Sequence, residues 1–180
     1  MHPWHDIDIT AETVAEGFPS VIEIPAGSKN KYELDKVTGM LRLDRVLYGA
    51  VHYPVNYGFI PRTFCDDGDP LDVLVLGQEP VEPMTLVQAR AIGVMRMRDE
   101  GKADDKIIAV NLHDPAVSEF GDQRDLPPHL MAEMRKFFEE YKTLEHKEVA
   151  IDKFQGPVEA VQIITEALEL YRRDIAPRRS

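Results

Sequence analysis

The densest group of chemically useful side chains in the 180-residue sequence is the acidic segment of residues 66–72, DDGDPLD. Gly68 and Pro70 favour a tight turn here. On such a turn the carboxylates of Asp67, Asp69 and Asp72 can converge on one point. Converging carboxylates repel one another unless a cation lies between them, and hard oxygen ligands suit Mg²⁺ or Mn²⁺. The segment therefore predicts a divalent-cation site, and a solvated acidic turn is the ordinary alternative.

A second acidic segment, residues 98–106 (RDEGKADDK), separates two runs with strong strand character. It adds Asp99 and Asp104 to the candidate metal ligands, and Lys106 stands at the start of the following strand. Taken alone, such a loop is most simply a solvated hairpin tip.

Cationic and phenolic side chains elsewhere can bind an anion. Lys31 and Glu33 share one face of a strand because they are two positions apart. Arg45, at the end of the next predicted strand, can reach the same face, although a surface arginine is the commoner case. Tyr53 and Tyr57 flank a proline in a segment that we interpret as an irregular loop. Their hydroxyls can donate to phosphate oxygens, but aromatic packing explains Tyr53 equally well.

Tyr141 and Lys142 are adjacent near the end of a predicted amphipathic helix. Tyr141 lies on the apolar face, where core packing is its ordinary role, and Lys142 lies near the edge of that face.

Composition narrows the classes of partner. The chain has 32 acidic and 21 basic residues and a formal net charge of −11, which disfavours nucleic-acid binding and requires cations before a small anion can bind. The single cysteine, Cys65, excludes an internal disulfide and fits a reducing compartment. The amino terminus lacks the pattern of a secretory signal, and no apolar run approaches the roughly 18 residues that span a bilayer. We therefore expect a cytoplasmic protein with neither a nucleic-acid nor a membrane partner.

The order of predicted elements indicates the fold class. Apolar and alternating runs predict strands over residues 21–24, 31–35, 40–44, 71–76, 85–97 and 107–112, with a hairpin turn at Thr38-Gly39. The apolar period then changes to that of a helix at Leu130, Met134, Phe137, Tyr141 and Leu144. A strand over residues 149–154 follows. A second helix opens at Pro157, with its apolar face at Val158, Val161, Ile164, Leu168 and Tyr171. Segregated strands and helices favour a closed or rolled sheet with helices outside it.

Together these segments resemble the family I soluble inorganic pyrophosphatases. The family signature, Asp-Gly-Asp-Pro-hydrophobic-Asp-hydrophobic, is present at residues 67–73. Further segments match family blocks in family order: VIEIP at residues 21–25, KYE at 31–33, LDR at 43–45, YPVNYG at 53–58, DE at 99–100 with DDK at 104–106, and FFEEYK at 137–142. The chain is similar in length to the short, prokaryotic type. The resemblance implies a mainly β, α+β fold, namely a five-stranded OB-like barrel with flanking C-terminal helices. It also implies a single domain over residues 1–180, in which residues 1–20 are a lead-in segment, and a homohexamer.

The resemblance also assigns roles to residues. Those that match the family's metal ligands are Asp67, Asp72, Asp99, Asp104 and Glu33, with Asp72 bridging two metals. Those that match its phosphate-binding groups are Lys31, Arg45, Tyr57, Lys106, Tyr141 and Lys142. Asp69 matches the proposed general base, and Glu23 and Tyr53 match supporting residues.

The activity implied is Mg²⁺-dependent hydrolysis of inorganic pyrophosphate to two orthophosphates. Several Mg²⁺ ions per active site, replaceable by Mn²⁺, Zn²⁺ or Co²⁺, separate the anionic substrate from the carboxylates and acidify a water that attacks in line. Three alternatives are a non-enzymatic OB-like binding module, a metal-dependent phosphatase for phosphomonoesters or nucleotides, and a catalytically silent relative. The charge argues against the first, and the complete set of site residues argues against the last.

Overall fold

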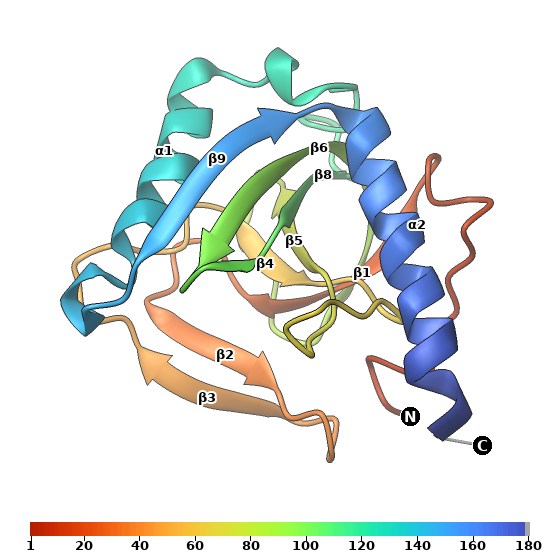
Figure 1. Cartoon of the computed structure of the whole chain (residues 1–180). Coiled ribbons are helices and arrows are strands. Elements are labelled where there is room, and N and C mark those ends of the chain that lie inside the picture. Colours follow the sequence, from red (N-terminus) through yellow and green to blue (C-terminus); the bar gives the residue numbers. More distant parts are fainter. Residues whose placement is uncertain (179–180) are drawn as a thin grey trace.

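The computed structural model describes residues 1–178 and consists mainly of β-strands, with two long helices near its C-terminal end (Figure 1). The strands are β1 (Phe18–Ile24), β2 (Asn30–Leu34), β3 (Leu41–Val46), β4 (Asn56–Phe59), β5 (Asp72–Leu76), β6 (Leu86–Asp99), β7 (Lys102–Ala103), β8 (Lys106–Asn111) and β9 (Val149–Gln155). The α-helices are α1 (Pro128–Glu140) and α2 (Pro157–Asp174), and the short 3₁₀ helices are η1 (Gln123–Asp125), η2 (Thr143–Glu145) and η3 (Ala176–Arg178).

Five strands pair in a closed ring, in the order β1-β4-β5-β8-β6 and back to β1. The pairing of β5 with β8 is parallel, and the other four pairings are antiparallel. Strand β9 extends the sheet alongside β6, while β2 and β3 form a separate hairpin that lies below the ring in Figure 1. The predicted five-stranded, OB-like arrangement with flanking helices is thus confirmed.

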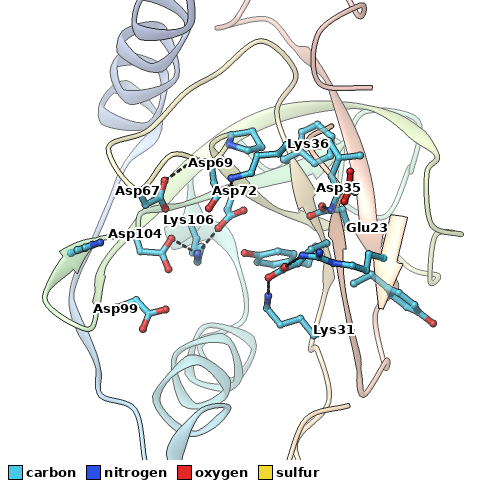
Figure 2. A pocket seen from close by; sticks show the side chains of 18 of the residues that line it. Glu23, Lys31, Asp35, Lys36, Asp67, Asp69, Asp72, Asp99, Asp104 and Lys106 are labelled. Carbon is cyan, nitrogen blue, oxygen red and sulfur yellow. Dashed lines mark hydrogen bonds and ion pairs between the residues drawn. The ribbon is translucent and has the colours of Figure 1, made fainter. Parts of the chain in front are cut away.

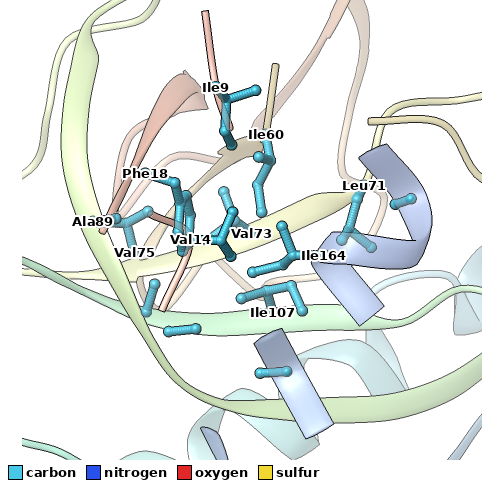
Figure 3. Packing of buried hydrophobic residues seen from close by; sticks show 14 of the residues in the cluster. Ile9, Val14, Phe18, Ile60, Leu71, Val73, Val75, Ala89, Ile107 and Ile164 are labelled. Carbon is cyan, nitrogen blue, oxygen red and sulfur yellow. The ribbon is translucent and has the colours of Figure 1, made fainter. Parts of the chain in front are cut away.

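The central strands of the ring are buried on both faces. Val73 of β5 packs with Ile107 of β8 and Ile164 of α2 in one apolar cluster (Figure 3). The next residues along these strands, Leu74 and Ile108, belong to a second cluster that includes Phe137 and Phe138 of α1. Because each helix covers one cluster, both faces of β5 and β8 are apolar. This explains why the sequences of β5 and β8 are nearly continuous runs of hydrophobic residues.

Two local expectations were wrong. The segment interpreted as an irregular loop contains β4, whose pairing with β1 and β5 supplies the hydrogen bonds that local sequence does not reveal. The apolar faces predicted for the two helices also include residues that the structure leaves exposed. Helix α1 ends at Glu140, so that Leu144 is 60% exposed, and Val158, in the first turn of α2, is 78% exposed.

The amino-terminal segment is shorter than expected, since β1 begins at Phe18 rather than after residue 20. Trp4 and Val14 are buried, and the Trp4 indole donates to the Thr63 carbonyl oxygen (2.8 Å). The lead-in segment therefore packs on the ring. Within residues 1–178 no helix has both the length and the apolarity to cross a membrane.

Gly58 in β4 generates a stability prediction. A Cβ at this position would overlap the carbonyl oxygen of Val21 and lie 2.9 Å from the Ile22 Cα, both of which are backbone atoms of β1. We expect Gly58→Ala to lower the free energy of unfolding by about 3 kcal/mol, because overpacking against backbone cannot relax by side-chain rotation. Urea denaturation measures this change. Gly49→Ala, where a Cβ would meet nothing within 4 Å, is the matched control. A loss below about 1 kcal/mol for Gly58→Ala would show that β1 and β4 can separate at little cost.

Candidate active site

A pocket of about 710 Å³ lies between the β2–β3 hairpin and the ends of β5, β6 and β8 (Figure 2). Its lining includes most of the residues singled out from the sequence: Glu23, Lys31, Glu33, Tyr57, Asp67, Asp69, Asp72, Asp99, Asp104, Lys106, Tyr141 and Lys142. The structure therefore brings together residues from segments that are more than a hundred positions apart. Arg45 and Tyr53 do not line the pocket.

A buried lysine occupies the centre of the acidic group. Asp72 and Lys106 stand opposite each other at the first register position of the parallel strands β5 and β8. The Lys106 Nζ lies 2.5 Å from an oxygen of Asp72 and 2.5 Å from an oxygen of Asp104, and the side chain is 3% exposed. Burial alone would lower the pKa of Lys106, but the two carboxylates outweigh it and raise the pKa well above its usual value. Lys106 is therefore a permanent positive charge in the pocket.

The surrounding carboxylates are crowded and partly desolvated. Burial, with repulsion from Asp69 and Asp72, raises the pKa of Asp67 to about 6, although the Asp69 backbone N–H donates to it (3.0 Å). Burial and the charge of Asp104 also raise the pKa of Asp72. These two carboxyls therefore lose their protons less readily than free aspartic acid does, and an added cation would favour their ionised form.

Most carboxylates of the group pair with a lysine. Lys142 contacts Asp99, Lys31 contacts Glu33, and the Lys36 Nζ lies 2.5 Å from Asp69. In this arrangement no three acidic, histidine or cysteine side chains of residues 1–178 are grouped as metal ligands.

The donor set nevertheless suits a hard divalent cation. One oxygen of Asp99 is buried and accepts no hydrogen bond, and a buried acceptor of this kind is costly unless something binds it. Together with the raised pKa values of Asp67 and Asp72, this oxygen fits a site for Mg²⁺ among oxygen ligands.

Tyr53 and Tyr57 have different surroundings. Tyr53 is buried, and its ring centroid lies 4.6 Å from that of Phe137 and 5.4 Å from that of Tyr57. It therefore packs behind Tyr57. The Tyr57 ring lies in the pocket wall with the Lys106 ammonium 5.7 Å from its centroid.

Arg45 lies beside the pocket without lining it. It pairs in register with Lys31 across the hairpin, but its guanidinium contacts Asp44 and Glu145.

Sequence reasoning missed Lys36, Arg42 and Lys102, which also line the pocket. Lys36 holds the acidic turn to the hairpin, since its Nζ also donates to the Gly68 carbonyl oxygen (3.1 Å). The only sequence signal was a lysine close to a predicted turn, and such residues are usually solvated.

Comparison with known proteins gives one family. The sequence profile of the inorganic pyrophosphatase family matches residues 20–172. The chain is 54% identical to soluble inorganic pyrophosphatase 2 of Chlamydomonas reinhardtii over 99% of this chain and 92% of that protein. It is 56% identical to soluble inorganic pyrophosphatase PPA1 of Solanum tuberosum, over 94% of this chain and 80% of that protein.

Solved structures agree with this result. The inorganic pyrophosphatase of Thermus thermophilus superposes with a TM-score of 0.89 at 37% identity, covering 94% of this chain and 99% of that one. The enzyme of Helicobacter pylori gives a TM-score of 0.87 at 40% identity, covering 93% and 99%.

Glu23 in the pocket wall predicts a pH effect on stability. It is buried and accepts a hydrogen bond from the Leu34 backbone N–H (2.7 Å), and burial, followed by the charge of Asp72, raises its pKa from 4.5 to about 8. Because the folded-state pKa is above the unfolded one, the stability that this group contributes is full below about pH 4.5 and is lost as the pH rises through 8.

We expect the free energy of unfolding of metal-free Glu23→Gln to equal that of the wild type near pH 5 and to exceed it by a few kcal/mol at pH 9. The reason is that glutamine stays neutral and keeps an acceptor oxygen. Thermal unfolding in EDTA from pH 5 to 9 measures the difference, with the exposed Glu82→Gln as the control. Parallel pH profiles for Glu23→Gln and the wild type would show that Glu23 is not held protonated.

Proposed function

The chain belongs to the inorganic pyrophosphatase family and is an inorganic diphosphatase, and we propose that it hydrolyses pyrophosphate to two orthophosphates by Mg²⁺-dependent, in-line attack of water. The observation that carries this mechanism is a single pocket in which crowded carboxylates alternate with lysines. Such a pocket repels a bare anion, yet has groups for both a divalent cation and phosphate oxygens.

The metal ligands in this proposal are Asp67, Asp72, Asp99, Asp104 and Glu33, all of which line the pocket. Bound Mg²⁺, or Mn²⁺, Zn²⁺ or Co²⁺ in its place, supplies positive charge between carboxylates and phosphates and lowers the pKa of water. The buried, unbonded oxygen of Asp99 supports this assignment.

Several side chains are suited to bind phosphate oxygens. Lys106 remains charged throughout the neutral pH range. Burial raises the pKa of both Tyr57 and Tyr141 above its usual value, so their hydroxyls keep their protons and remain donors. Lys31 and Lys142 add charge from opposite walls. Arg45 completes the set once its guanidinium turns toward the substrate.

Asp69 is the proposed general base. Its side chain is 54% exposed, compared with 23% for Asp72, the other acid of this turn that pairs with a lysine. It accepts a proton from the attacking water as the new P–O bond forms and the bridging P–O bond breaks. Because water attacks the phosphorus directly, the reaction needs no covalent enzyme intermediate, and the leaving orthophosphate takes its proton from solvent. Lys106 and Lys142 neutralise the charge that develops on it.

We further propose a cytoplasmic location, one domain over residues 1–180, of which residues 179–180 lie outside the described structure, and a homohexameric assembly. The near-complete coverage of the Thermus thermophilus chain supports one domain. The net charge of −11 disfavours nucleic acid as a partner.

Orthophosphate release tests the proposed mechanism. We expect rapid release from pyrophosphate with Mg²⁺ at neutral pH, loss of release in EDTA, and much slower hydrolysis of p-nitrophenyl phosphate and ATP. Release that persists in EDTA would overturn the metal dependence. Equal rates on the phosphomonoester would favour the phosphatase alternative.

Asp72→Asn tests the metal-bridging role. If Asp72 holds two cations, losing its carboxylate should reduce kcat/KM by at least about 100-fold and raise the Mg²⁺ concentration for half-maximal rate. Initial rates across a Mg²⁺ titration measure both changes. Asp66→Asn, in the same turn but outside the pocket lining, is the matched control. Near-normal activity of Asp72→Asn at ordinary Mg²⁺ would contradict the bridging role.

A further inference from the structure

The Arg45 guanidinium is held by two carboxylates outside the pocket. Its Nη1 lies 2.5 Å from Asp44, while its Nη2 and Nε lie 3.0 and 2.9 Å from the two oxygens of Glu145. Glu145 belongs to η2, which follows α1, and its side chain is only 9% exposed. The arginine thus bridges the β2–β3 hairpin and the segment after α1, which are one hundred residues apart in sequence.

Glu145 occupies an edge of the Arg45 guanidinium that can also hold a phosphate. The Nε and Nη2 atoms form the fork that holds two carboxylate oxygens or two phosphate oxygens equally well. The carboxylate therefore stands in for a phosphate on Arg45.

The ion pair is imperfect. The buried Arg45 Nε lies 2.9 Å from a Glu145 oxygen but makes no hydrogen bond of acceptable geometry. The Arg45 Nε–H is therefore still available to a better-placed acceptor, such as a phosphate oxygen.

The pocket is close to this pair on both sides. Lys31, the register partner of Arg45, lines the pocket, as do Tyr141 and Lys142 from the segment that leads to Glu145. A change in the Arg45 side chain, without movement of the strands, is enough to exchange one anion for the other.

We propose that Glu145 competes with phosphate for Arg45: it holds the guanidinium when no phosphate is bound and takes it back as orthophosphate leaves. This inference rests on the proposed function. It makes Glu145 a positioning residue that limits the affinity for both substrate and product.

The test is orthophosphate binding to Glu145→Gln, which keeps the shape of the side chain and removes its charge. We expect the Kd for orthophosphate, measured by calorimetry with Mg²⁺, and the KM for pyrophosphate each to fall about threefold or more. Glu139→Gln is the matched control, because Glu139 lies on α1 and its side chain pairs with Arg135, at 3.6 Å, and not with Arg45. In an Arg45→Ala background, Glu145→Gln should have no further effect.

An unchanged or raised Kd in folded Glu145→Gln overturns the proposal and leaves Glu145 as a structural support for Arg45. If Glu145→Gln does not fold, Glu145→Asp must lower the Kd, since its side chain is one methylene shorter and holds the carboxylate farther from Nε and Nη2. Failure of the proposed function is a separate result, because it would appear as a wild-type protein without Mg²⁺-dependent orthophosphate release.

Discussion

The contact of Lys106 with Asp72 and Asp104 is the interaction on which the pocket depends. Parallel pairing of β5 and β8 places Asp72 opposite Lys106 at the mouth of the ring, and the buried ammonium neutralises part of the acidic group. Removing one partner of a buried ion pair leaves an uncompensated charge, which is far more costly than the pair is stabilising. The fold thus places opposite charges together, and the apolar clusters beneath them hold the strands in register.

The balance of charge also defines what the pocket can bind. Four lysines neutralise part of the carboxylate charge, but Asp67 and Asp72 keep raised pKa values and an oxygen of Asp99 stays unbonded. A phosphate anion without metal is repelled by these groups. A metal without an anion leaves the lysines with no phosphate oxygens to bind. The pocket is therefore complementary to an anion that arrives with divalent cations, and this electrostatic requirement explains why so acidic a protein can act on a phosphate compound.

Asp67, Asp69 and Asp72 could be singled out from the sequence because they are close together in the chain and their spacing alone suggests convergence, and all three line the pocket. The sequence predicted the closed sheet because strands and helices are segregated. It did not predict β4, whose short run gains its pairing from β1 and β5. It also did not predict the contact of Lys36 with Asp69 or that of Glu145 with Arg45, since both depend on side-chain directions across distant segments.

The position of the β2–β3 hairpin explains why its contacts can change during turnover. Leu34 anchors β2 to the core, but β3 is largely exposed and pairs only with β2 within the described residues. Besides this apolar contact, ion pairs of Lys36 with Asp69 and of Arg45 with Glu145 attach the hairpin to the rest of the site. The half-exposed pair of Lys36 with Asp69 contributes at most about 1 kcal/mol, and on Arg45 a phosphate would replace one anion with another, so neither change need disrupt the core. The ring supplies the rigid charges of the site, and the hairpin supplies those that exchange partners.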